Sequence, residues 1–320
     1  MEDRVKQQAR ETAAGTSVPH ESAALHVAGE ATYVDDIPEL AGTCHIALGL
    51  STQAHARIKS IDLDAVRAAP GVVGVIVAAD IPGHNDCGPI IHDDPILADD
   101  LVQFVGQPVF AAVATSFTAA RKAVGLASIE YESLPAVLDV ATGKSQQSWV
   151  LPPMQLRRGD AEQALKSAAR KMQGQFSVGG QEQFYLEGQI SYVAPKEDGC
   201  FHLWCSTQHP TEMQQVVAHT LGIDFNQVLV EMRRMGGGFG GKESQSAIFA
   251  CITAVAAYRL RCPVKLRLDR DDDMLITGKR HGFEFDYEVG YDDAGLIQGA
   301  KIEMAAQAGF SADLTGPVVT

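Results

Sequence analysis

The sequence has 320 residues, of which 46% are hydrophobic and 21% are charged, and its formal net charge is −14. These values are typical of a globular protein with about two domains. The acidic excess argues against a nucleic-acid-binding protein, because phosphate contacts require clustered Lys and Arg. No apolar run reaches the ~18 residues of a membrane span, and the polar N-terminus lacks the apolar centre of a signal peptide. We therefore expect neither nucleic acid nor membrane as a partner, and a cytoplasmic location.

A polar arm at residues 1–18 precedes a first domain at residues 19–138, in which short helix and strand patterns alternate. Apolar runs indicate buried strands, and Pro70-Gly71 ends a helical pattern. The expected elements are helices at residues 64–69 and 117–124, the second capped by Ser116, and strands at residues 72–77, 108–114 and 129–131. This pattern predicts a small α/β domain without a visible catalytic cluster.

A more polar segment at residues 139–160 contains Pro152-Pro153 and is predicted to be a linker. It leads to a second unit at residues 161–320. The elements expected there are helices at residues 161–171, 211–221 and 244–260 and strands at residues 174–178, 201–205 and 228–232. The helix at 244–260 is apolar on almost all sides, which predicts that it is buried. The fold class is therefore α+β, and the second domain is interpreted as incomplete at Thr320.

The six cysteines form no CxxC motif and no cluster with iron–sulfur spacing. They are Cys44, Cys87, Cys200, Cys205, Cys251 and Cys262. We expect all six to be reduced, structural thiols, as is usual in the cytosol.

Residues 233–244 read RRMGGGFGGKES and contain five glycines within six positions. The span Gly236 to Lys242 satisfies GxxxxGK, but Glu243 stands where a phosphate-binding loop has Ser or Thr to hold magnesium. The same glycines satisfy GxGxxG, yet no acidic residue follows at the spacing of a dinucleotide site. Neither nucleotide motif is complete.

Bare glycine backbone still indicates a close approach to a ligand, and amides before a helix favour an anion or a developing negative charge. Phe239 either packs against the following helix or forms a wall of a planar site. Glu243 either stabilises the helix dipole from the first turn or contacts a substrate. The residues alone leave both pairs of interpretations open.

Several separate motifs, in order, resemble the molybdopterin-binding large subunit of the xanthine dehydrogenase family of molybdenum hydroxylases. They are RRMGGGFGGKES at 233–244, GGQEQFYLE at 179–187 and DRDDDMLITGKRH at 269–281. The segments HVAGEATYVDDIP (26–38) and VGQPVFAAVA (105–114) resemble the hammerhead domain of that family. The phrase YLEGQ at 185–189 is typical of bacterial members. The resemblance covers residues 19–320 and implies a hammerhead-type α/β domain followed by the first part of a molybdopterin-binding α+β domain.

The resemblance implies an oxidoreductase of purine catabolism that binds the molybdenum cofactor and hydroxylates hypoxanthine and xanthine with oxygen from water. Electrons would pass through iron–sulfur clusters and FAD to NAD. The FAD and 2Fe-2S groups are expected on a small partner subunit in a dimer of heterodimers. Three alternatives remain open: an aldehyde oxidase-like molybdenum hydroxylase, a degenerate P-loop module, and a non-catalytic assembly fragment.

The same resemblance implies roles for four residues. Gln181 matches a glutamine that contacts the molybdenum oxo group, although it could instead satisfy buried backbone groups. Phe239 and Gly240 match loop positions against the cofactor, and Glu243 matches a glutamate that binds the purine. Gln181 and Phe239 would lie near molybdenum without ligating it. The general-base glutamate of the family is not found up to Thr320, so the chain alone is expected to be inactive, and Asp271 to Asp273 are expected to be solvated or at an interface.

Overall fold

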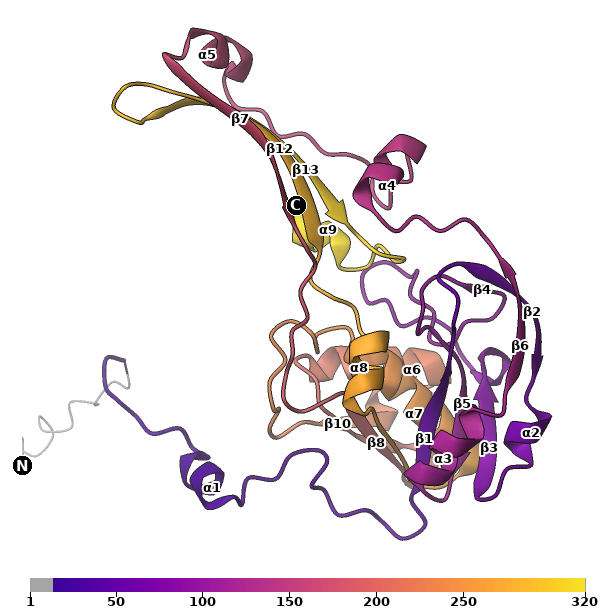
Figure 1. The fold of residues 1–320 in the computed structure, drawn as a ribbon. Helices are drawn as coiled ribbons and strands as arrows, with labels where there is room; N and C mark the ends of the chain where they lie inside the picture. The colour runs from indigo at the N-terminus through magenta and orange to yellow at the C-terminus, as the bar shows by residue number, and fades with distance from the viewer. Residues whose placement is uncertain (1–13, 320) are drawn as a thin grey trace, which may run out of the picture.

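The computed structural model describes residues 14–319, so most of the predicted polar arm lies outside the described residues. The body is built on a seven-stranded mixed sheet (Figure 1). Its strands, in spatial order, are β10 (Val228–Glu231), β9 (Phe201–Cys205), β8 (Ile190–Pro195), β11 (Val264–Arg267), β1 (Cys44–Leu50), β5 (Pro108–Ala114) and β3 (Val72–Val77). The parallel pairing of β1 with β11 joins strands from the two predicted domains. The division into two domains at residues 139–160 stays a prediction, and strands from both sides of that segment belong to the same seven-stranded sheet.

Helices cover both faces of this sheet. On one face lie α6 (Pro210–Leu221) and α7 (Ser246–Leu260), and α3 (Phe117–Val124) packs against β1 and β5 on the other. Pro210 begins α6, and Gly222, with a φ of 64°, ends it. Ser116 caps α3 by accepting from the Ala119 N–H. The apolar α7 is buried along most of its length, as predicted.

A smaller sheet completes the N-terminal part. It consists of β4 (Leu101–Val102), β2 (Ala56–Asp62) and β6 (Ser128–Ser133). The short helix α2 (Asp64–Arg67) and a core that includes Val102, Val109 and Phe110 pack beside it. Helix α1 (Ala23–Ala28) lies on the extended N-terminal segment (Figure 1).

A third sheet projects from the body and was not predicted in full. It has the order β13 (Ile297–Gln307), β12 (Gly282–Tyr291), β7 (Arg170–Val178). The antiparallel register pairs Phe176 with Phe285 and Phe285 with Met304, so these side chains share one face. The opposite face carries Asp286 and Glu303, both close to Lys144 of α4 (Val140–Gln146).

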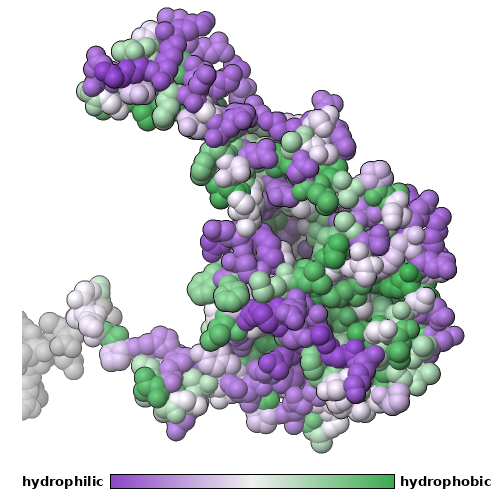
Figure 2. Space-filling model, in the orientation of Figure 1, coloured by the Kyte–Doolittle hydropathy of each residue, from purple (hydrophilic) through white to green (hydrophobic). Residues whose placement is uncertain are grey.

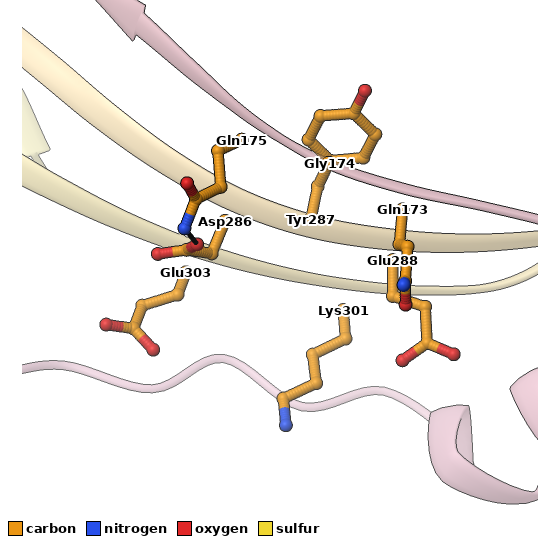
Figure 3. Close-up of a pocket in the computed structure, with 8 residues that line it drawn as sticks. All are labelled: Gln173, Gly174, Gln175, Asp286, Tyr287, Glu288, Lys301 and Glu303. Carbon is orange, nitrogen blue, oxygen red and sulfur yellow. Dashed lines mark hydrogen bonds between the residues drawn. The ribbon is translucent and has the colours of Figure 1, made fainter.

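Side chains on the two faces of this sheet point in opposite directions (Figure 3). There Tyr287 points away from the side that Asp286, Lys301 and Glu303 occupy. A shallow hollow of about 380 Å³ lies on this sheet and is lined mainly by polar residues. A recess lies between the projecting sheet and the body, with apolar residues along its edge (Figure 2).

Three sequence expectations need correction. The predicted linker contains α4, whose first turn is capped by Asp139. The predicted helix at 161–171 is shorter, because α5 (Ala161–Ser167) gives way to β7 at Arg170. Strand β3 is only partly buried rather than fully so. Two further helices are α8 (Arg270–Ile276), which precedes β12, and α9 (Thr315–Val319), which follows β13. Across residues 14–319 no helix is long and apolar enough to cross a membrane.

Candidate functional site: the glycine loop

The glycine loop, residues 236–242, connects β10 to α7 at the end of the large sheet. Its backbone is unusual at three positions, since φ is 97° at Gly237, 53° at Phe239 and 88° at Gly240. The left-handed region suits glycine but is uncommon for a bulky residue such as Phe. This conformation leaves 63% of Phe239 exposed instead of packing it onto α7.

Gln208 holds the middle of the loop from below. Its Oε1 accepts from the Gly240 N–H at 2.9 Å and from the Lys242 N–H at 3.2 Å. A Cβ on Gly238 would lie 2.6 Å from the same oxygen, so any larger residue there would displace the Gln208 side chain. With Oε1 engaged, the Gln208 Nε2 has no partner within residues 14–319 and remains a free donor beside the loop. The sequence motifs did not single out Gln208.

Lys242 points inward and cannot reach a phosphate at the loop surface. Its side chain is 0% exposed, and its Nζ donates to the Glu187 carbonyl at 2.6 Å and to Ser206 Oγ at 2.7 Å. Burial lowers the pKa of Lys242, while Glu187 acts in the opposite direction. A phosphate-binding loop needs this lysine free for the β- and γ-phosphates. The P-loop alternative therefore loses its main cation.

A buried polar network joins the three sequence motifs beneath the loop. The Tyr185 hydroxyl donates to Asp273 Oδ1 at 2.6 Å, and the Gln189 N–H donates to Asp273 Oδ2 at 2.7 Å. The Gln189 amide also donates to the Gly241 carbonyl at 2.9 Å. The pKa of Tyr185 is raised, first by burial and then by Asp273. The expectation of a solvated Asp271–Asp273 run is wrong for Asp273, because that carboxylate organises the network.

Glu243 lies before α7, not inside it. The helix starts at Ser246, and its first turn contains no acidic residue. The interpretation that Glu243 stabilises the helix dipole from the first turn of the helix is therefore wrong. The side chain is exposed, and its carboxylate has no hydrogen-bond or ion-pair partner in the described part of the chain. It remains available to a ligand that approaches the loop.

Gln181 is connected to the glycine loop only indirectly, through Arg280. Its backbone forms a bridge with Arg280, and the Arg280 guanidinium donates to the Phe239 carbonyl at 3.3 Å. No hydrogen bond links Gln181 itself to Phe239, Gly240 or Glu243 among the described residues. The structure therefore places Phe239 and Gly240 on the loop and Glu243 directly after it, whereas Gln181 is connected to the loop only through Arg280.

The outer surface of the loop suits a large acceptor-rich ligand. The N–H groups of Gly237, Gly238 and Phe239 have no hydrogen-bond partner within residues 14–319. A Cβ on Gly240 would meet nothing within 4 Å, so the surface there is open. Unpaired amides, the Gln208 Nε2 and an exposed aromatic ring fit a cofactor with oxo and phosphate oxygens and a planar ring system.

Four of the six cysteines are buried, namely Cys44, Cys87, Cys205 and Cys251. All six are free thiols, which confirms that part of the prediction. Burial raises the pKa of Cys205 to about 11 and that of Cys251 to about 12, so these thiols stay protonated. No group of three or more His, Cys, Asp and Glu residues between positions 14 and 319 could hold a metal ion.

The chain matches two protein families along its length. Residues 28–135 match the aldehyde oxidase and xanthine dehydrogenase a/b hammerhead domain, and residues 144–320 match the molybdopterin cofactor-binding domain. These matches confirm the resemblance on which the predicted fold class depends.

Relatives from distant organisms support the same assignment. The chain is 45% identical to xanthine dehydrogenase of Oryza sativa subsp. japonica over 96% of this chain and 23% of that protein. It is 40% identical to aldehyde oxidase 2 of Cavia porcellus over 98% of this chain and 23% of that protein. It thus spans less than a quarter of these curated relatives.

A solved structure shows the same fold. Quinoline 2-oxidoreductase from Pseudomonas putida 86 superposes with a TM-score of 0.81 at 26% identity, covering 91% of this chain and 39% of that one. Fold, motifs and sequence profile agree, and the chain belongs to the molybdenum hydroxylase family, in which a hammerhead domain precedes a molybdopterin cofactor-binding domain.

Proposed function

We propose that this chain forms part of a xanthine dehydrogenase, binds the molybdenum cofactor on its glycine loop and orients a purine with Glu243. The observation that carries the proposal is the loop with the residue that follows it. Phe239 is exposed, a Cβ on Gly240 would meet nothing within 4 Å, and the exposed Glu243 carboxylate has no partner among the described residues. When bound, the cofactor would supply a metal centre that activates oxygen derived from water and accepts electrons from the substrate.

The chain's own contribution would be binding and orientation. The unpaired N–H groups of Gly237 to Phe239 would donate to acceptor oxygens of the cofactor. Phe239 would form an apolar wall against a planar ring. The Glu243 carboxylate would accept from a purine N–H and so orient the ring. A preorganised group of this kind is worth about 2–4 kcal/mol in a transition state.

Two glutamines compete for the contact with the molybdenum oxo group. The resemblance to the family suggests Gln181, whereas the structure favours Gln208. The Gly240 and Lys242 N–H groups both donate to Gln208 Oε1, which fixes the amide and leaves its Nε2 available as a donor. We propose Gln208 as the stronger donor and keep Gln181 as the motif's candidate. Replacing each by Ala separates them: loss of molybdenum affinity in one variant only would identify the contact.

The wider assembly follows the family. We propose FAD and 2Fe-2S groups on a small partner subunit, a dimer of heterodimers, and cytoplasmic purine catabolism. These proposals concern the whole protein, since the chain spans only 23% of the length of xanthine dehydrogenase of Oryza sativa subsp. japonica. The general base would come from outside residues 1–320.

An aldehyde oxidase-like activity is the second candidate, because aldehyde oxidase 2 of Cavia porcellus is nearly as similar as the xanthine dehydrogenases. Glu243 favours the purine, since an aldehyde offers no ring N–H for a carboxylate. The test is Glu243→Ala and Glu243→Gln in the complete, assembled enzyme, with molybdenum content measured alongside. We expect kcat/KM for xanthine to fall by about 10²- to 10³-fold at unchanged molybdenum content, with aldehyde turnover little affected. Unchanged xanthine kinetics would show that Glu243 does not bind the substrate.

A further inference from the structure

Both ends of the glycine loop meet at one buried carboxylate. At the start of the loop, Glu187 Oε2 accepts from the Gly236 N–H at 2.9 Å, and the Glu187 N–H donates to the Gly236 carbonyl at 3.2 Å. At the end of the loop, Lys242 Nζ lies 3.3 Å from the same Oε2. Ser206 Oγ donates to Oε2 at 2.5 Å and accepts from Lys242 Nζ at 2.7 Å.

The packing leaves little freedom in this arrangement. A Cβ on Gly236 would lie 2.5 Å from the Glu187 Cβ, so the backbone runs directly against that side chain. The Lys242 ammonium also lies 4.6 Å from the centre of the Tyr185 ring, which favours a cation at that position. The second carboxylate oxygen of Glu187 is buried without a partner in the described residues. Within residues 14–319, Lys242 is the only cationic side chain that pairs with this carboxylate.

We propose that Lys242 and Glu187 are positioning residues: their buried ion pair clamps the two ends of the glycine loop and so fixes the backbone that presents Phe239, Gly240 and Glu243. Neither side chain reaches the outer surface of the loop, so both act through the backbone. A buried pair resists separation because either charge alone would be left without a partner. Closing both loop ends on one side chain also lowers the number of conformations that the residues between them can adopt.

The clamp concerns the conformation of the loop, and only its consequence for cofactor binding rests on the proposed function. Two readouts therefore separate the questions. Hydrogen exchange of the peptide that spans residues 236–243, in cofactor-free complete protein, reports the loop. Molybdenum retained after dialysis, in the cofactor-loaded protein, reports the function.

The test uses Lys242→Met, Glu187→Gln and the double variant. We expect each single change to speed exchange of the Gly236 and Gly240 amides by about 10-fold or more, because an unpaired buried group destabilises the closed loop. In the double variant, exchange should rise by much less than the product of the single effects, since the two residues act as a pair. The variants whose loop exchanges faster should also retain less molybdenum after dialysis.

Lys265 offers a matched control. Its side chain is 7% exposed and pairs with Asp35 at 2.8 Å and Glu39 at 3.1 Å, on the N-terminal segment and not on the loop. Lys265→Met should lower the free energy of unfolding yet change loop exchange by less than about 2-fold. An equal loop effect in this variant would mean general destabilisation and would overturn the clamp.

Ser206→Ala keeps the test valid if Lys242→Met does not fold. It removes one hydrogen bond from each partner and should give a smaller but measurable acceleration of loop exchange. Unchanged exchange in every folded variant, or single effects that multiply fully in the double variant, would refute the clamp. If the complete wild-type protein retains no molybdenum when the cofactor is supplied, but Lys242→Met still speeds loop exchange, the proposed function is refuted and the clamp stays intact.

Discussion

The large sheet and the projecting sheet are stabilised in different ways. Strand β5 is buried at every position, and α7 is buried along most of its length, so the large sheet depends on helices packed on both faces. In the projecting sheet β7 and β13 are mostly exposed, and the face that carries Phe176 and Met304 is bare in the described structure. The projecting sheet therefore depends mainly on its own ladders and cross-strand pairs, with α5 packed closely against Gly290 and Gly299.

The difference explains where a precise site can be built. The glycine loop leads into α7. Gln189 directly precedes β8, Gln208 lies between β9 and α6, and Asp273 lies on α8, so all three are held by the body. Side chains held by packing and by second hydrogen bonds keep a site within a fraction of an ångström. The projecting sheet offers no comparable support, although a shallow polar hollow lies on it. Its polar side chains lie on an exposed surface.

The largest expected effect lies in α7. Replacing Phe249, which is almost fully buried in the main core, by Ala should lower the free energy of unfolding by about 3–5 kcal/mol, because a cavity remains beside well-packed neighbours. Urea unfolding measures this. A loss of less than about 1 kcal/mol would show that the body is no better packed than the projecting sheet.

A smaller effect is expected for Tyr185→Phe, which removes one hydroxyl. That hydroxyl donates to Asp273 and accepts from the Gln189 amide, so the change leaves buried partners unsatisfied. We expect a loss of about 1–3 kcal/mol, measured by urea unfolding. Tyr287→Phe on the projecting sheet is the matched control, because its hydroxyl has no hydrogen-bond partner in the described region, and it should be nearly neutral. Equal losses would contradict the contrast between the sheets.

Four acidic residues lie where the body meets the segment that follows β13. The Asp313 carboxylate accepts from the Ile90 and Ile91 N–H groups, and Asp93 accepts from Ala312 N–H. Burial, followed by Asp313, Asp86 and Asp93, raises the pKa of Asp94 from 3.8 to about 7. Because the folded state binds this proton more tightly, its contribution to stability is present below pH 3.8 and is lost as the pH rises through about 7.

Asp94→Asn should therefore flatten the pH dependence of unfolding in this range. Between about pH 5 and about pH 8, we expect the wild type to lose roughly 1–2 kcal/mol more than the variant. Parallel urea titrations at both pH values test this. Identical slopes for the two proteins would mean that Asp94 titrates normally.

Much of the body could be predicted from local sequence signals. Pro210 and Gly222 marked the ends of α6, and the unbroken apolar run of α7 indicated its burial. The register of the projecting sheet could not be predicted, because β7 lies more than a hundred residues before β12 and its apolar positions alternate with glycine and polar residues. Tertiary pairing, rather than local propensity, decides such strands.

The site shows the same limit. The glycine motif located Phe239, Gly240 and Glu243 on one loop, since a continuous segment keeps its residues together. Gln208 lies on a different segment, and only the fold brings its amide to the Gly240 N–H. Asp273 could not be distinguished from Asp271 and Asp272 in the sequence, because three consecutive Asp residues have identical side chains. Its direction into the core depends on the orientation of α8 against Tyr185.

The smallest expected effect tests the bare face directly. Phe176 is 60% exposed and touches mainly its cross-strand neighbour Phe285, with ring centres 6.1 Å apart. Phe176→Ser should change the free energy of unfolding by less than about 1 kcal/mol, because a cross-strand pair is worth only a fraction of a buried side chain. The same change should reduce binding of a hydrophobic fluorescent dye to this chain. A loss as large as that of Phe249→Ala would mean that the face is covered in solution, and the sheet would then depend on packing as the body does.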